Sequence, residues 1–222
     1  MRLPWAGRRV EHLRRYRRVI EVFLRHGFGY LVEQLDLAHY LPLGRRIFGR
    51  RSTGASLAVG QRLRAALAEL GPTYVKLGQL LSTRADLIPP DILSELQHLQ
   101  DDVPPVPFEA VRRVLERELK KPLSEAFTAF ASEPVAAASI GQVHEAVLPG
   151  GEPVVVKVQR PGIGRIIELD MEILFQLARL AQERLRPELF SPVTLVEEFA
   201  TTLRRELDYR IEARYAERFR EN

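Results

Sequence analysis

A short alanine-rich stretch followed by a lysine is the part of this sequence whose residue types and spacing could do chemistry. Residues 136–143 read AAASIGQV, and residues 154–157 read VVVK. A nucleotide-binding loop of the pattern G-x-G-x-x-G-x-V holds phosphates against its backbone N–H groups, and a lysine on the following strand contacts them as a point charge. The last glycine and the valine of this pattern are present, whereas Ala136 and Ala138 replace its first two glycines. The pattern therefore predicts a phosphate-binding loop with Lys157 beside it.

An ordinary β-hairpin is the alternative interpretation of the same residues. Small residues suit a tight turn, and Lys157 could reach solvent along its apolar stem. Fourteen residues separate Val143 from Lys157, which fits two short strands joined by a turn at 149–152. Because alanine restricts φ and adds a methyl group, we expect the loop to change nucleotide geometry or selectivity and not simply to lose binding.

A second retained lysine marks another motif. Only four of the 33 basic residues are lysine, and one of them begins the sequence KLGQ at 76–79. This motif lies in a predicted helix, where Lys76 and Gln79 share one face because they are three residues apart. Gly78 between them is expected to allow a close approach of the backbone.

The composition excludes several classes of site. The 222 residues include no cysteine, so a disulfide framework, a thiolate zinc site and a cysteine nucleophile are excluded. The five histidines are scattered without a metal-binding spacing, and no metal site is predicted within this chain. No apolar run reaches the roughly 18–20 residues that span a bilayer, and no secretory signal is visible.

The charge is unevenly distributed along the chain. The net charge is +4, but residues 1–50 carry eleven Arg against four acidic residues, a balance of +7 that leaves −3 for the remainder. A basic amphipathic helix is expected over 8–26, and such a helix can lie on an anionic membrane surface. The alternatives are an arginine-rich helix that is simply solvated and a helix that packs on its own domain. Binding of nucleic acid is the weaker interpretation because the segment lacks interleaved aromatic residues on one face.

Hydrophobic periodicity and turn residues predict an α+β chain. Helices are expected over 8–26, 57–70, 73–87, 90–100, 108–120, 163–184 and 193–220, and antiparallel strands over 127–135, 141–148 and 153–159. The proline-rich segment 101–107 is predicted to be an extended linker. The predicted domains are a basic helical N-terminus at 1–55, a helical extension with its linker at 56–107, and a sheet-containing lobe at 108–222.

Four motifs, in this order, resemble the UbiB/AarF family of atypical protein-kinase-like ATPases. They are KLGQ at 76–79, AAAS at 136–139, VVVKVQRPG at 154–162 and ELDYRIEA at 206–213. The resemblance implies a protein-kinase-like small lobe, made of an antiparallel sheet plus helix C, preceded by a family-specific helical extension. In that family an alanine-rich loop replaces the glycine-rich one. Its members bind and hydrolyse ATP and act in ubiquinone biosynthesis or related isoprenoid-lipid homeostasis.

The resemblance also assigns roles within the lobe. It identifies Lys157 as the catalytic lysine that contacts the ATP phosphates, and Glu212 as the helix-C glutamate that pairs with it. It implies that the nucleotide lies on Ala136, Ala137, Ala138 and Ser139, together with the lysine.

The remaining motifs are regulatory by resemblance. Lys76 and Gln79 are implied to face Glu206 and Asp208 of an ExD motif, so that the extension hinders access of a protein substrate. In a single straight helix, Asp208 and Glu212 would share a face, whereas Glu206 and Asp208 would lie about 200° apart. Lys76 and the catalytic lysine are therefore expected to form ion pairs with different members of this set of carboxylates.

The kinase pattern also requires a catalytic-loop Asp and Asn and a later Asp that holds magnesium, and no such motif follows Lys157. The sequence is therefore expected to be the N-terminal part of a longer protein, inactive alone, with the larger lobe and the Mg²⁺ ligands beyond Asn222. The resemblance implies ATP, a membrane surface or isoprenoid lipid and other quinone-biosynthesis proteins as partners, without nucleic acid. It implies a cytoplasmic protein on the inner face of the membrane, anchored there in its full-length form. The alternative function is a non-catalytic lipid or quinone-precursor carrier for which ATP is a structural switch.

Overall fold

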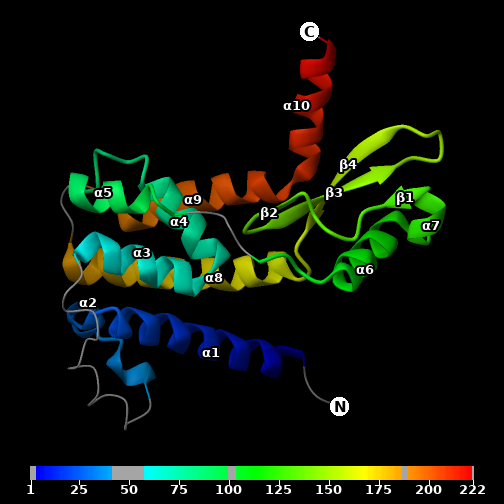
Figure 1. The fold of residues 1–222 in the computed structure, drawn as a ribbon. Coiled ribbons are helices and arrows are strands. Elements are labelled where there is room, and N and C mark those ends of the chain that lie inside the picture. The colour runs from blue at the N-terminus through cyan, green and yellow to red at the C-terminus, as the bar shows by residue number, and fades with distance from the viewer. Residues whose placement is uncertain (1–3, 42–57, 100–103, 187–189, 222) are drawn as a thin grey trace. The chain divides into compact units, whose positions relative to one another are not determined.

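The structure is a computed structural model that describes residues 4–41, 58–99, 104–186 and 190–221. The chain forms two compact units (Figure 1). We call residues 100–165 the sheet unit, and residues 1–99 with 166–222 the helical unit. The predicted boundary between residues 55 and 56 lies outside the described residues, as do the first residues of the predicted linker. The two C-terminal helices, which the sequence-based division placed in the sheet-containing lobe, group with the N-terminal helices.

The sheet unit is a small antiparallel sheet with helices beside it, and the α+β fold class is confirmed. Strand β3 is central, since β4 pairs along one edge while β1 and β2 pair with opposite ends of the other edge. Gly151 has a φ of 85°, which the tight turn between β3 and β4 requires. The elements are α6 (Phe108–Leu119), α7 (Leu123–Ala126), β1 (Ala129–Phe130), β2 (Ala136–Ala137), β3 (Gly141–Val147) and β4 (Pro153–Gln159).

One predicted strand is wrong in extent. The segment 127–135 was expected to be a single strand, but only Ala129–Phe130 forms β1, and β2 begins afterwards. The segment between them keeps isolated bonds to β3, from the N–H of Ala131 to the carbonyl of Glu145 and from the N–H of Val135 to the carbonyl of Val143. The two donors are four residues apart, whereas their acceptors on β3 are only two apart, so this segment holds extra residues and a continuous ladder cannot form.

The core of the sheet unit lies between α6 and one face of the sheet. Val111 and Leu115 of α6 are buried with Leu123 and with Val158 of β4. Along β3 and β4 the burial alternates, as expected for strands with one covered and one open face. The open face is therefore the side of the sheet that is available to a ligand.

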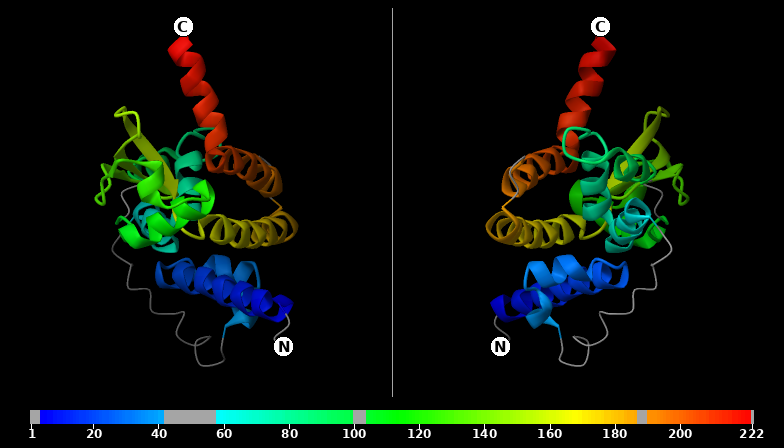
Figure 2. Two further views of the ribbon diagram at one scale, coloured as in Figure 1. Left: turned by 90° about the vertical axis from the view of Figure 1, so that its right-hand side faces the viewer. Right: turned by 90° about the vertical axis from the view of Figure 1, so that its left-hand side faces the viewer.

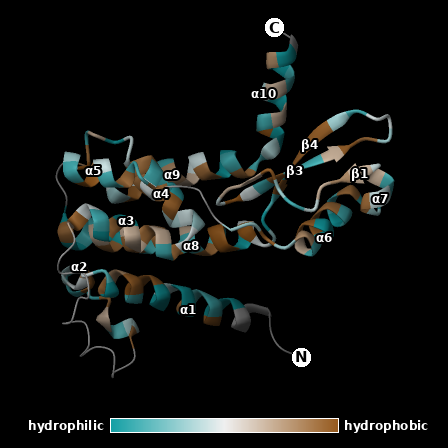
Figure 3. Ribbon diagram, viewed as in Figure 1, coloured by the Kyte–Doolittle hydropathy of each residue, from teal (hydrophilic) through white to brown (hydrophobic). Residues whose placement is uncertain are grey.

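The helical unit is a layered set of helices. Within it, α8 lies between α1 and α9 (Figures 1 and 2). Hydrophobic and hydrophilic positions alternate along α1, as expected for an amphipathic helix (Figure 3). The elements are α1 (Pro4–Arg25), α2 (Gly29–Gln34), η1 (Ala38–Tyr40), α3 (Val59–Leu70), α4 (Pro72–Leu81), α5 (Pro90–Leu96), α8 (Ile163–Leu185), α9 (Pro192–Leu207) and α10 (Tyr209–Glu221).

A glycine lets α4 approach its neighbours. A Cβ atom placed on Gly78 would lie 2.2 Å from a side-chain methyl of Leu99 and 2.8 Å from one of Leu67. Any side chain at this position would displace both leucines, so the close approach expected at Gly78 is confirmed. The approaching groups are leucine side chains of the same unit.

The predicted helix 193–220 is instead two helices that meet at Asp208. Helix α9 ends at Leu207, Asp208 has a non-helical backbone (φ −93°, ψ 86°), and α10 begins at Tyr209. The carboxylate of Asp208 accepts a bond from the backbone N–H of Arg210 at 3.1 Å. Aspartate competes in this way for the orphan N–H groups of a new helix, which is the physical reason for the break. The expectation that Asp208 and Glu212 share a face of one helix is therefore wrong.

Candidate functional site

Two predicted site residues, Ala136 and Lys157, lie in one row across the sheet unit with the motif residue Val143 between them. Ala136 of β2 is directly opposite Val143 of β3, and Val143 is directly opposite Lys157 of β4. Directly opposed residues of antiparallel strands point to the same face, and each strand-to-strand step is about 4.8 Å. The alanine-rich segment and Lys157 therefore share one face of the sheet, two strands apart.

This shared face is the open one. Lys157 is exposed, and Val155, two residues earlier on β4, is 69% exposed. The alternating direction of side chains along a strand places both on the same side. An exposed valine beside an exposed lysine gives this face an apolar surface next to a cation.

The alanine-rich loop has an ordinary backbone. Among the described non-glycine residues, positive φ occurs at Asp36, Lys120 and Arg186, so the loop alanines lie at negative φ. The loop is closed by a bond from the N–H of Ala138 to the carbonyl of Gly141 at 2.8 Å. Alanine is therefore fully compatible with this loop, which does not use the conformations that only glycine reaches.

Ser139 follows these alanines and is completely buried. Its Oγ has no hydrogen-bond partner among the residues that the structure describes. A buried hydroxyl without a partner is costly, and such groups are uncommon in folded proteins. The loop thus holds one polar atom that a ligand could satisfy.

A network that the sequence analysis missed lies on the covered face. Gln142 and His144 are buried on β3, and the Gln142 amide donates to Nε2 of His144 at 2.8 Å. His144 then donates from Nδ1 to the carbonyl of Ala131 at 2.8 Å. Gln142 Oε1 accepts from the N–H of Val106 at 2.9 Å, which holds the linker against the sheet. Polar residues at core-facing positions of β3 were the available signal.

A second residue without a predicted role is Arg160, directly after β4. Its Nε donates to the carbonyl of Ala138 at 2.8 Å, and its backbone N–H donates to the carbonyl of Ile140 at 3.0 Å. Both terminal nitrogens lie 3.1 Å from the carbonyl oxygen of Pro104. One arginine therefore contacts the alanine-rich loop and the linker together. Its only signal in the sequence is its place in the VVVKVQRPG motif.

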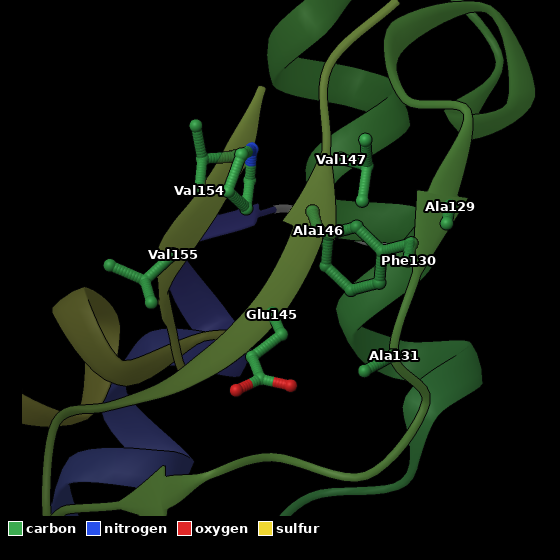
Figure 4. Close-up of a pocket in the computed structure, with 9 residues that line it drawn as sticks. Ala129, Phe130, Ala131, Glu145, Ala146, Val147, Val154 and Val155 are labelled. Carbon is green, nitrogen blue, oxygen red and sulfur yellow. The ribbon is translucent and has the colours of Figure 1, made fainter. Parts of the chain in front are cut away.

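A groove of about 760 Å³ lies at the other end of the same sheet. Figure 4 shows Glu145, Ala146 and Val147 of β3 along it, with the segment around Phe130 on one side and Val154 and Val155 on the other. Its lining is mostly apolar and does not include Lys157 or the loop. Val155 belongs to the groove and also neighbours Lys157 along β4, so the groove adjoins the row at that residue.

The regulatory motifs meet in the helical unit through an ion pair of Lys76 with Glu206. Lys76 Nζ lies 3.4 Å from a carboxylate oxygen of Glu206, with the two side chains 17% and 38% exposed. Gln79 instead donates to the carbonyl of Leu99 at 3.1 Å. Asp208 pairs with Arg210 at 2.7 Å, and this hydrogen bond holds the pKa of Asp208 below its usual value. Of the predicted set, the structure brings together Lys76 and Glu206.

Glu212, the predicted partner of Lys157, is exposed on α10 of the helical unit. Burial raises the pKa of the neighbouring Tyr209 to about 12, and the charges of Glu212 and Glu206 add to the effect. The predicted pair spans the two units, so its formation stays a prediction.

The basic helix α1 uses much of its charge within the helical unit. Arg15 makes two bonds of 2.6 and 2.9 Å to Asp170 of α8, which is fully buried. The terminal nitrogen of Arg18 lies 2.6 Å from the carboxylate of Glu69, which also accepts from His26 at 2.9 Å. This packing corresponds to the alternative of a helix that docks on its own domain. Association of this helix with a membrane stays a prediction.

Neither a membrane-spanning helix nor a metal-binding cluster occurs among the described residues. None of the helices in the described ranges is long and apolar enough to cross a membrane. Within the same ranges, no group of three or more His, Asp or Glu side chains is placed to hold a metal ion.

The chain is similar to several known proteins over part of their length. A family model described as the ABC1 atypical kinase-like domain matches residues 98–222. A Marinobacter nauticus protein named Probable protein kinase UbiB is 46% identical over 167 residues, covering 75% of this chain and 30% of that protein. An uncharacterized Synechocystis protein is 40% identical over 221 residues, which is 99% of this chain and 50% of that protein. A solved Mycobacterium tuberculosis protein in complex with erythromycin is 34% identical, with a TM-score of 0.43 over 65% of this chain and 37% of that one. The chain thus spans half or less of each of these proteins.

Proposed function

Because the chain belongs to the ABC1 atypical kinase-like family, we propose that it contains the nucleotide-contacting part of an ATP-binding atypical kinase or ATPase of the UbiB type. The nucleotide is ATP, and the sheet unit contacts it with the alanine-rich loop and Lys157. Catalysis belongs to the whole protein, whose role by resemblance is in ubiquinone biosynthesis or isoprenoid-lipid homeostasis.

The row Ala136–Val143–Lys157 is the observation that carries this proposal. It puts the loop and a cation on one open face, at a separation that a polyphosphate can bridge. Lysine suits this position because its ammonium contacts phosphate oxygens as a compact point charge.

The loop residues fit a nucleotide as well. The buried Oγ of Ser139 gains a partner if a phosphate oxygen reaches the loop. Val155 offers exposed apolar surface to the base, on the same side of β4 as Lys157. In the bound state these residues hold and orient the nucleotide, whose phosphoanhydride bond supplies the chemistry of the reaction.

We further propose that the helical extension regulates this site. Lys76 and Glu206 join α4 to α9, and the approach of Leu67 and Leu99 over Gly78 fixes α4 in place. The extension is therefore a firmly held element, as hindrance of a protein substrate requires. The predicted pairing of Lys157 with Glu212 belongs to this proposal.

A carrier of lipid or quinone precursors, switched by ATP, is the second candidate. The groove around Phe130, Val147 and Val154 favours it, because a mostly apolar surface of this size suits an isoprenoid chain. Retention of a short isoprenoid quinone by the full chain, without turnover of ATP, would favour the carrier over the kinase.

Binding of ATP by calorimetry tests the proposed site. Lys157→Met should weaken binding about 10–150-fold, since loss of a charged hydrogen bond costs about 1.5–3 kcal/mol. Lys121→Met is the matched control, because Lys121 is an exposed lysine of the same unit outside the row. Equal ATP affinity in the wild type and Lys157→Met would remove Lys157 from the site.

A further inference from the structure

Arg160 makes an unusual set of contacts for an arginine. Its side chain donates to two backbone carbonyls, that of Ala138 in the loop and that of Pro104 in the linker. Its own N–H bonds the carbonyl of Ile140. The residue thus contacts the loop at two points and the linker at a third.

The geometry of the guanidinium group explains why position 160 is an arginine. Its planar fork presents Nε and the terminal nitrogens in fixed, diverging directions, so one group can bond two carbonyls that belong to different segments. The ammonium of lysine has no such fixed geometry. Burial lowers the pKa of Arg160, because removing the charged guanidinium from water costs free energy. The bonds to the carbonyls offset this cost.

The bond to Ala138 determines the direction of the next N–H group. The peptide between Ala138 and Ser139 is planar and trans, so its C=O and N–H point in opposite directions. When Arg160 holds the carbonyl on one side, the N–H of Ser139 is fixed on the other. Backbone N–H groups are what a loop of this kind offers to phosphate.

The linker is held by the same unit at two places. Pro104 and Pro105 have no N–H, so their carbonyls are the only backbone groups by which the sheet unit can bind them. Arg160 binds the carbonyl of Pro104, and Gln142 binds the N–H of Val106. A shift of the linker would therefore be transmitted to Ala138 through one side chain.

We propose that Arg160 is a positioning residue for the alanine-rich loop, which fixes the Ala138–Ser139 peptide and couples it to the linker at Pro104. The nucleotide role of this residue rests on the proposed function. Its mechanical role, as a bridge between the loop and the linker, does not.

Hydrogen exchange and ATP binding, measured on the full chain, test the two roles separately. In Arg160→Gln, exchange of the loop peptide 136–143 should accelerate about tenfold or more, because the loop loses its bridge. ATP affinity should fall about tenfold, with the melting temperature as a measure of folding.

Arg160→Lys keeps the charge and the stem but not the fork, so it should exchange and bind like Arg160→Gln. Arg117→Gln, at an arginine of the same unit that is 71% exposed, is the matched control and should leave both readouts unchanged.

Each result has a distinct meaning. Loop exchange unchanged in both Arg160 variants would overturn the proposal, even if the wild type binds ATP and the proposed function stands. Full rescue by Arg160→Lys would overturn the argument from the guanidinium fork. If the wild type binds no ATP, the proposed function fails and the nucleotide role of Arg160 fails with it, whereas faster loop exchange would still establish the bridge. If Arg160→Gln does not fold, Arg160→Lys decides between these outcomes.

Discussion

Backbone freedom is the residue-scale property that distinguishes this loop from a glycine-rich one. The loop alanines lie at negative φ, and Arg160 and Gly141 hold Ala138 by its carbonyl and its N–H. A side chain at these positions restricts the backbone without straining it. We infer that the alanines keep the loop in one shape, which selects among nucleotides by fit.

Ala138→Gly tests this inference. Glycine adds conformations at positive φ, so the backbone N–H groups can follow the terminal phosphates. We expect the ratio of ATP to ADP affinity to change several-fold, with a loss of about 0.4–1 kcal/mol in the free energy of unfolding. Ala129→Gly, at the exposed residue of β1, is the control for stability alone. If a folded variant binds both nucleotides within twofold of the wild type, the alanines have no role in nucleotide selection and serve only to pack the turn.

At the scale of elements, two ion pairs hold α4 and the turn after it along α9. Lys76 pairs with Glu206, and Arg84 lies 2.9 Å from Glu198. The two cations are eight residues apart, as are the two carboxylates, and they pair in opposite chain order. The extension is therefore held at two points, two helical turns apart along α9.

A double-mutant cycle measures the first of these pairs. Lys76→Met and Glu206→Gln should each destabilise the protein, and their coupling energy should be about 0.2–1 kcal/mol, because one partner is more than a third exposed and the pair is screened. Chemical unfolding of the wild type, both single variants and the double variant gives this value. Additive effects would show that α4 and α9 are held by packing around Gly78 and not by this pair.

Docking of α1 predicts a dependence of stability on pH. The hydrogen bond from His26, followed by the charges of Arg25 and Arg18, lowers the pKa of Glu69 from 4.5, although partial burial opposes this shift. A carboxyl with a lowered folded pKa stabilises the protein above its unfolded pKa, and this contribution is lost as the pH falls through the folded value. Glu69→Gln should therefore be less stable than the wild type by about 1 kcal/mol at pH 7. The difference should shrink as the pH falls below 4.5, as measured by denaturant unfolding at several pH values. A difference that is constant with pH would mean that Glu69 acts by packing alone.

At the scale of the whole molecule, the sequence was informative where the signal is local. The β3–β4 hairpin follows from its valine-rich strands, from the turn at 149–152 and from the fourteen-residue spacing of Val143 and Lys157. The start of α4 follows from Gly71, at a φ of 97°, and from Pro72 in the first turn. Local rules of turn and helix chemistry determine these features.

Long-range partners could not be predicted in this way. Arg15 and Asp170 are 155 residues apart, and the pattern of α1 allowed docking on its own domain as well as on a membrane. Arg160 bonds backbone carbonyls, which every residue carries, so no residue type marks Pro104 or Ala138 as its acceptors. The break at Asp208 was hidden because the surrounding Arg and Glu residues favour helix, and one capping side chain decided the outcome.

Hydrogen exchange of the full chain, with and without saturating ATP, tests the central claim that nucleotide lies on the row Ala136–Val143–Lys157. We predict that ATP slows exchange at least several-fold in the peptides that cover 136–143 and 153–159. The peptides of α1, at 4–25, should be unaffected and serve as the internal reference. Binding of ATP that leaves both sheet peptides unchanged, or that slows exchange only elsewhere, would contradict the account.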